Sequence, residues 1–188
     1  MRRSRTLLAT LMSVVTAAAG LLVFQAPAAA YTANNCRQVA LRSVANGLYV
    51  STEAAYPGKM DGLLRARAQV IGPWEKFYLC QIIGGGRSGS SEAFDSTLDG
   101  NNGWWTTERA DGDYVRARPD GTIIDVWEEF YTVRASGCSL ECYAIRSVDA
   151  NRWLSAEVGV KDPNYNGYLR ARGTEIGPWE KFDFIWLA

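Results

Sequence analysis

Trp-Glu-x-Phe occurs three times in the chain, at Trp74-Glu75-Lys76-Phe77, Trp127-Glu128-Glu129-Phe130 and Trp179-Glu180-Lys181-Phe182. The three tryptophans are spaced by 53 and 52 residues. A fixed spacing of this size is typical of a protein built from internal repeats. The motif therefore marks the same position in three copies of one unit.

Three further motifs recur in the same order before each Trp-Glu-x-Phe. They are an opening run (residues 40–43, 93–96 and 144–147), an aromatic run that ends in Glu (49–53, 104–108 and 153–157) and Arg-Ala-Arg (65–67, 116–118 and 170–172). Four motifs repeated in one order define three repeats, at about 37–86, 87–137 and 138–188.

Each repeat has the pattern of four short strands. The runs are rich in aromatic and β-branched residues with period-two alternation, and they are separated by turn signals such as Asn46-Gly47, Asp61-Gly62 and Asp111-Gly112. No stretch shows a sustained helical period. Three four-stranded repeats predict an all-β chain with the β-trefoil fold, twelve strands and pseudo-threefold symmetry. A propeller also has four strands per blade, but it needs at least about four blades.

Composition excludes several classes of function. The chain has 188 residues and no histidine, so it cannot build a Ser-His-Asp or Cys-His nucleophile or a histidine metal ligand. Residues 31–188 hold 17 basic and 20 acidic side chains, a net charge of −3. A mildly acidic domain gives no electrostatic reason to expect a nucleic acid or an anionic membrane as its partner. We expect no metal and no cofactor.

Residues 1–30 resemble a signal peptide. Arg2, Arg3 and Arg5 precede an apolar stretch, and Ala28-Ala29-Ala30 offers a small-residue cleavage site. The alternative is an uncleaved membrane anchor, although the apolar stretch is close to the shortest that spans a bilayer. We predict cleavage and a secreted, extracellular domain at 31–188.

Secretion implies an oxidising compartment, in which the four cysteines form two disulfides. Three pairings are possible for Cys36, Cys80, Cys138 and Cys142. The nearness of Cys138 to Cys142 favours a small local loop, which leaves Cys36 to pair with Cys80.

The repeat resembles that of fascin-like β-trefoil domains. The resemblance rests on Ala-Leu-Arg-Ser, Tyr-Val-Ser-Thr-Glu, Leu-Arg-Ala-Arg and Gly-Pro-Trp-Glu-Lys-Phe in the first repeat, and it covers residues 37–188. The middle repeat departs from it, with Asp125-Val126 in place of Gly-Pro and Asp95 in place of an arginine. The resemblance implies a binding or bridging module and not an enzyme. Animal relatives bundle actin, and bacterial and plant relatives often accompany carbohydrate-active enzymes.

We interpret Trp-Glu-x-Phe as a structural motif. The sequence predicts that both aromatic side chains wedge into the barrel and that the glutamate accepts hydrogen bonds from backbone or arginine. The nine residues assigned this role are Trp74, Glu75, Phe77, Trp127, Glu128, Phe130, Trp179, Glu180 and Phe182.

The glutamates that end the aromatic runs are expected to face arginines across a hairpin. Glu53 is expected opposite Arg65 or Arg67, and the same scheme applies to Glu108 and Glu157. Two such carboxylates would serve a glycosidase only if they faced each other across a cleft.

Five aromatic residues are candidate ligand contacts. Tyr49, Trp104 and Trp153 hold equivalent positions, where they would stack on sugars if exposed or pack the hairpins if buried. Tyr56 and Tyr165 lie in loops that are longer in the first and third repeats than in the second. Loops on a rigid scaffold are common binding sites.

The sequence therefore predicts a non-catalytic binding module that recognises a glycan or polysaccharide. The alternatives are a protein-binding module (an actin-binding relative, a protease inhibitor or a secreted effector) and a carboxylate-based glycoside hydrolase.

Overall fold

A computed structural model describes residues 32–54, 58–83, 91–96, 103–118, 124–138 and 141–188. The expected signal segment and Tyr56 lie outside the described residues. Strands and short 3₁₀ turns make up the regular structure of the described part, as expected of an all-β chain.

The strands fall into three consecutive groups of four. The first group is β1 (Thr32–Ser43), β2 (Tyr49–Thr52), β3 (Leu64–Ala68) and β4 (Phe77–Ile83). The second is β5 (Glu92–Ser96), β6 (Gly103–Glu108), β7 (Tyr114–Arg118) and β8 (Phe130–Arg134). The third is β9 (Cys142–Ser147), β10 (Arg152–Ala156), β11 (Leu169–Gly173) and β12 (Lys181–Trp186).

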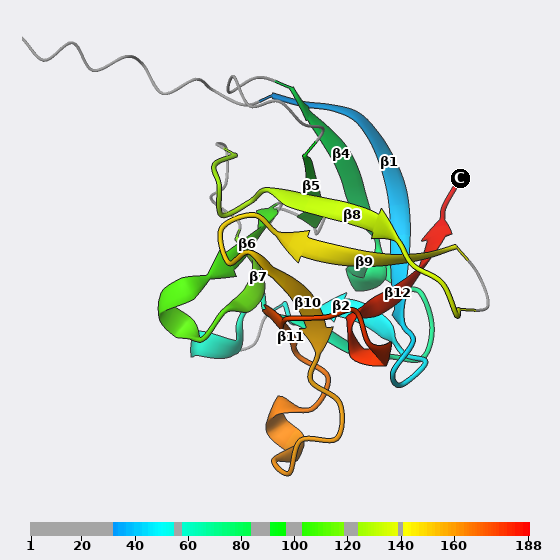
Figure 1. Ribbon diagram of the computed structural model, residues 1–188, viewed down its shortest axis with the longest axis vertical. Coiled ribbons are helices and arrows are strands. Elements are labelled where there is room, and N and C mark those ends of the chain that lie inside the picture. The colour runs from blue at the N-terminus through cyan, green and yellow to red at the C-terminus, as the bar shows by residue number, and fades with distance from the viewer. Residues whose placement is uncertain (1–31, 55–57, 84–90, 97–102, 119–123, 139–140) are drawn as a thin grey trace, which may run out of the picture.

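The first and last strands of the three groups close into a barrel. All of their pairings are antiparallel, in the order β1, β4, β5, β8, β9, β12 and back to β1. The ring has no free edge that could pair with another chain. Figure 1 shows five of these strands, β1, β4, β5, β8 and β9, in the upper part of the view.

The middle two strands of each group form a hairpin, and the three hairpins cap one end of the barrel. They are β2–β3, β6–β7 and β10–β11. Each hairpin donates a backbone hydrogen bond to another: Ala66 N to Gly167 O, Ala117 N to Gly62 O and Ala171 N to Asp113 O, at 2.7–2.9 Å. The cap is therefore a closed cycle, and no hairpin is held by its own repeat alone.

Arginine side chains also form hydrogen bonds between the hairpins of different repeats. The first arginine of each Arg-Ala-Arg donates to a carbonyl of another repeat: Arg65 to Asn166, Arg116 to Lys59 and Arg170 to Gly112, at 2.7–2.8 Å. The second arginine, Arg67, Arg118 or Arg172, forms an ion pair with Glu53, Glu108 or Glu157 of its own hairpin. In the middle repeat Arg116 also contacts Glu108. The expected cross-strand ion pairs are confirmed.

The core fills the barrel and the underside of the cap. Phe77, Phe130 and Phe182 are fully buried, as expected. The Trp105 ring stacks on Phe94 with centroids 4.4 Å apart and meets Phe77 edge-on at 4.8 Å. Burial of large aromatic side chains is the main apolar contribution to stability in a domain of this size.

The expected burial of the motif tryptophans is wrong. Trp74, Trp127 and Trp179 are 50%, 50% and 52% exposed. In the first and third repeats Pro-Trp-Glu forms a 3₁₀ turn, η2 (Pro73–Glu75) and η5 (Pro178–Glu180), and the strand begins only after it. In these two repeats the tryptophan lies within the turn and outside the barrel strand, so only the phenylalanine points into the core.

Both expected disulfides are present. Cys36–Cys80 joins β1 to β4, and Cys138–Cys142 closes a loop of four-residue separation at the start of β9. Among the described residues, no helix is long and apolar enough to cross a membrane.

Candidate functional site

A pocket of about 500 Å³ lies in the third repeat, beside the exposed Trp179. The end of β10 forms one side of it with Ser155, Ala156 and Glu157, and the end of β11 contributes Arg172 and Gly173. The segment from Thr174 to Glu180 completes the lining. Its volume lies within the range usual for small-molecule sites.

Local sequence explains why Trp179 faces this pocket. Gly177 precedes Pro178, whose fixed φ starts the 3₁₀ turn η5. The Glu180 carboxylate then reaches back and accepts a hydrogen bond from Gly177 N at 2.9 Å. Its other oxygen accepts one from the Ser155 hydroxyl. Glu180 is thereby buried and fixed, and the residue before it is left on the surface.

A second buried carboxylate, Glu157, lines the same pocket and forms an ion pair with Arg172. Burial raises the pKa of Glu157, and the neighbouring Arg172 charge opposes that rise. Gly173 permits the close packing behind these groups. A Cβ at Gly173 would lie 2.8 Å from Glu180 Cγ and 3.1 Å from Trp153 Cβ.

The pocket therefore combines a flat aromatic surface with polar groups held in place. Half of the Trp179 side chain is open to solvent. Around it are the guanidinium of Arg172, the carboxylates of Glu157 and Glu180, and the exposed Thr174 and Glu175. Such a surface can stack on an apolar ring face while it exchanges hydrogen bonds with hydroxyl groups at the ring edge.

The same arrangement recurs in the other repeats. Gly72 N donates to Glu75 at 2.7 Å beside Trp74, and Asp125 N donates to Glu128 at 2.9 Å beside Trp127. Thr106 donates to Glu128 at 2.8 Å, as Ser155 does to Glu180. The surroundings differ, because the first repeat has Val70 where the third has Glu175.

The aromatic residues selected from the sequence are not brought together. Tyr49, Trp104 and Trp153 are half-buried, each at the start of a cap hairpin, and no ring contact among the described residues joins any two of them. Trp104 packs on a small cluster that contains Ile82, and the Arg146 guanidinium lies 5.6 Å from the Trp153 ring centre.

Tyr165 lies in η4 (Pro163–Tyr165), in the β10–β11 loop that projects from the body of the molecule in orange in Figure 1. It is 46% exposed and does not line the pocket. Sequence reasoning assigned Trp179 to the core and so missed the pocket. The signal that could have located it is Gly177-Pro178, a typical start of a helical turn, placed before the tryptophan.

No family model matches the chain, and no curated protein matches it in sequence. Solved structures do resemble it in fold. The designed threefold-symmetric protein ThreeFoil aligns with 80% of this chain and 99% of its own, at 13% identity and a TM-score of 0.59. The BEL β-trefoil aligns with 83% of this chain and 96% of its own, at 14% identity and a TM-score of 0.59.

Cry35Ab1 aligns with 81% of this chain at 16% identity and a TM-score of 0.59, but the match spans only 36% of Cry35Ab1. At these identities the likeness concerns the fold alone. The predicted all-β chain is confirmed, and the strand pairing together with these neighbours supports the β-trefoil fold.

Proposed function

We propose that this protein is a secreted, non-catalytic module that binds carbohydrate, and that Trp179 is its main stacking residue. The observation that carries the proposal is the half-exposed indole at a pocket whose polar groups are fixed by hydrogen bonds and an ion pair. Rigid aromatic contacts with ordered polar neighbours bind with little loss of side-chain entropy. Two disulfides support the secreted location.

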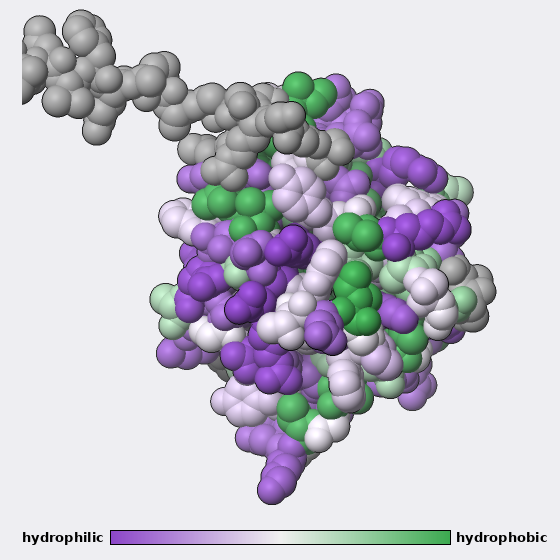
Figure 2. Space-filling view, in the orientation of Figure 1, coloured by the Kyte–Doolittle hydropathy of each residue, from purple (hydrophilic) through white to green (hydrophobic). Residues whose placement is uncertain are grey.

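The face of the molecule drawn in Figure 2 gives a further reason to favour a sugar over a large apolar protein partner. Figure 2 shows apolar residues in small groups between hydrophilic ones on the face in view. Permanent protein interfaces are broader and more apolar than this. An exposed aromatic ring surrounded by polar groups, such as Trp179 at this pocket, is better matched to a hydroxylated ligand.

A binding experiment with wall polysaccharides tests the proposal. Plant, fungal and bacterial wall polymers are offered to the purified protein, and retention is measured by pull-down and by affinity electrophoresis. We expect retention on at least one polymer and a loss of affinity of about 10-fold or more in Trp179→Ala. Tyr131→Ala, which removes another partly exposed aromatic side chain on β8, serves as the matched control and should bind normally.

Binding to none of these polymers would refute the proposal. Equal affinity of Trp179→Ala and the wild type for the polymer would show that the carbohydrate-binding site is not at this pocket. A parallel actin co-sedimentation assay checks the protein-binding alternative.

A carboxylate-based hydrolase is a second candidate, because Glu157 and Glu180 line one pocket. The raised pKa of Glu157 is in the direction that a general acid requires. Both carboxylates are already engaged, however, by Arg172, Gly177 and Ser155. Release of reducing ends from a bound polymer, abolished in Glu157→Gln, would establish this second function.

A further inference from the structure

Asp183, in the middle of β12, is buried and only partly satisfied. It is 2% exposed, and its Oδ2 accepts a hydrogen bond from Arg42 Nη2 at 2.9 Å. Its Oδ1 is buried and has no hydrogen-bond partner among the described residues. A buried acceptor without a partner is costly, so such an oxygen often marks a place where a ligand binds.

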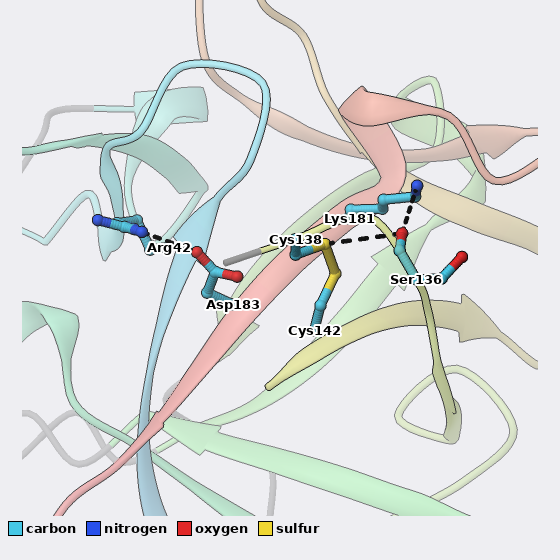
Figure 3. The surroundings of a disulfide bond; sticks show 6 residues. All are labelled: Arg42, Ser136, Cys138, Cys142, Lys181 and Asp183. Atoms are coloured by element: carbon cyan, nitrogen blue, oxygen red, sulfur yellow. Dashed lines mark hydrogen bonds and ion pairs between the residues drawn. A yellow bond between two sulfur atoms is a disulfide. The ribbon is translucent and has the colours of Figure 1, made fainter. Parts of the chain in front are cut away.

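The strand register sets Asp183 directly beside a disulfide. Asp183 is opposite Arg42 on β1 and opposite Cys142 on β9. The sulfur atoms of Cys138 and Cys142 and a carboxylate oxygen of Asp183 all lie within 4.8 Å of one another. Figure 3 shows Asp183 between Arg42 on one side and the disulfide on the other.

We propose that these three residues form a redox-gated site for a divalent metal ion that binds both thiolate and carboxylate, such as Zn²⁺. In the oxidised protein the two sulfurs are bonded to each other and do not ligate. A thiol or phosphine reductant supplies two electrons, the S–S bond breaks, and each sulfur takes up a proton. When the reductant is a thiol, two of its molecules are oxidised and join in a disulfide. When it is a phosphine, it takes oxygen from water and becomes the phosphine oxide. The metal ion then displaces the two thiol protons to solvent and binds both thiolates and Asp183 Oδ1.

Ligand type and spacing suit this assignment. Zinc sites commonly draw two cysteines from a segment with two to four residues between them, and three residues separate Cys138 from Cys142. Their Cα atoms are 5.8 Å apart. Thiolate and carboxylate are the zinc ligands open to a chain without histidine. With water in the fourth position the site would be tetrahedral.

The charges around the proposed site would balance those of the bound metal ion and its ligands. Two thiolates, one carboxylate and one divalent cation sum to a charge of −1, and the Arg42 guanidinium on the far side of Asp183 balances it. Arg42 holds the carboxylate through Oδ2, which leaves Oδ1 directed elsewhere. Lys181 Nζ donates to Ser136 O at 2.7 Å and so anchors the segment that leads to Cys138.

The full protein is tested with Co²⁺, whose charge-transfer absorption reports thiolate ligation. The protein is reduced with a phosphine, desalted without oxygen and titrated with Co²⁺, and Zn²⁺ is then added as a competitor. We expect one Co²⁺ per reduced chain, displacement by Zn²⁺ and no thiolate band in the oxidised protein. Asp183→Asn should weaken binding by about 10-fold or more. Cys138→Ser with Cys142→Ser should abolish it.

Matched variants separate this site from other groups. Cys36→Ser with Cys80→Ser removes the other disulfide and should keep the Co²⁺ band, and Glu141→Gln, beside Cys142, should bind as the wild type does. A reduced wild type without a thiolate band, or equal affinity in Asp183→Asn, overturns the proposal. So does a protein that circular dichroism shows to unfold on reduction both with and without the metal.

Discussion

Phe182 and Trp179 lie three residues apart in one motif and face different surroundings. Phe182 is fully buried, whereas Trp179 is half exposed beside the pocket. We expect Phe182→Ala to lower the free energy of unfolding by about 3–5 kcal/mol, because it opens a cavity in the core. Trp179→Ala should lower it by less than about 1 kcal/mol, as is usual for surface positions. Urea unfolding measures both values, and equal losses would contradict the assignment.

Glu157 makes stability depend on pH in a defined direction. Burial raises its pKa in the folded protein above the ordinary value of 4.5. A carboxyl with a raised pKa gives its stabilising contribution in full below that ordinary value and loses it as pH rises through the folded value. Glutamine resembles the protonated form and does not titrate. As pH rises from 4 to 7, the wild type should therefore lose unfolding free energy relative to Glu157→Gln.

That comparison requires urea titrations of both proteins at several pH values. Asp61→Asn, at an exposed carboxyl in the β2–β3 loop, is the matched control for removal of one acidic charge. A difference for Glu157→Gln that stays constant, or that moves in favour of the wild type as pH rises, would contradict the raised pKa.

At the scale of elements, the three cap hairpins depend on close backbone approach between repeats. Gly62 has φ +75°, and a Cβ there would lie 2.5 Å from Ala117 O of the next hairpin. Gly47 has a similar φ of +71° but nothing within 4 Å. Alanine at either position costs about 1–2 kcal/mol through the left-handed backbone. At Gly62 the overlap adds about 1–3 kcal/mol more.

Gly62→Ala should therefore be clearly less stable than Gly47→Ala in thermal or urea unfolding. Equal stability of the two variants would show that the cap relaxes without loss. The same reasoning applies to Gly167, where a Cβ would lie 2.6 Å from Ala66 O.

The sequence allowed the order of the strands and the Glu–Arg pairs to be predicted, because both depend on local patterns that recur three times. It did not distinguish Arg65 from Arg67 as the partner of Glu53. The β2–β3 register shifts between Tyr49 and Val50, and such an irregularity has no simple alternation signal. Arg65 is drawn instead to Asn166 of another repeat, a contact that only the assembled cap creates.

The candidate site was harder to predict, because the exposure of Trp179 depends on a local turn and on strand ends that only the fold brings together. Trp179 belongs to an identical motif in two repeats and a near-identical one in the third, and repeated aromatic residues usually indicate core packing. The 3₁₀ turn η5 reverses that expectation by placing the indole outside. The pocket also needs the ends of β10 and β11, which are separated by the long loop at residues 157–168.

For the whole molecule, ring closure joins the two ends of the described chain. β1 pairs with β12 from Val39↔Trp186 to Ser43↔Phe182, so the last strand completes the barrel that the first begins. Most stabilising contacts therefore connect residues far apart in sequence, and forming them restricts a long chain. A covalent link that spans much of one repeat should matter more than a local one.

The two disulfides provide that comparison within one molecule. Cys36–Cys80 has a sequence separation of 44 and Cys138–Cys142 a separation of 4. In the chain-entropy description, loops of these lengths correspond to stabilisation of about 4 and about 2 kcal/mol. We expect Cys36→Ser with Cys80→Ser to lower the free energy of unfolding by about 2 kcal/mol more than Cys138→Ser with Cys142→Ser does, when both are measured by urea unfolding without reductant. A larger loss for the short loop would mean that the Asp183 surroundings, and not chain entropy, determine what that disulfide contributes.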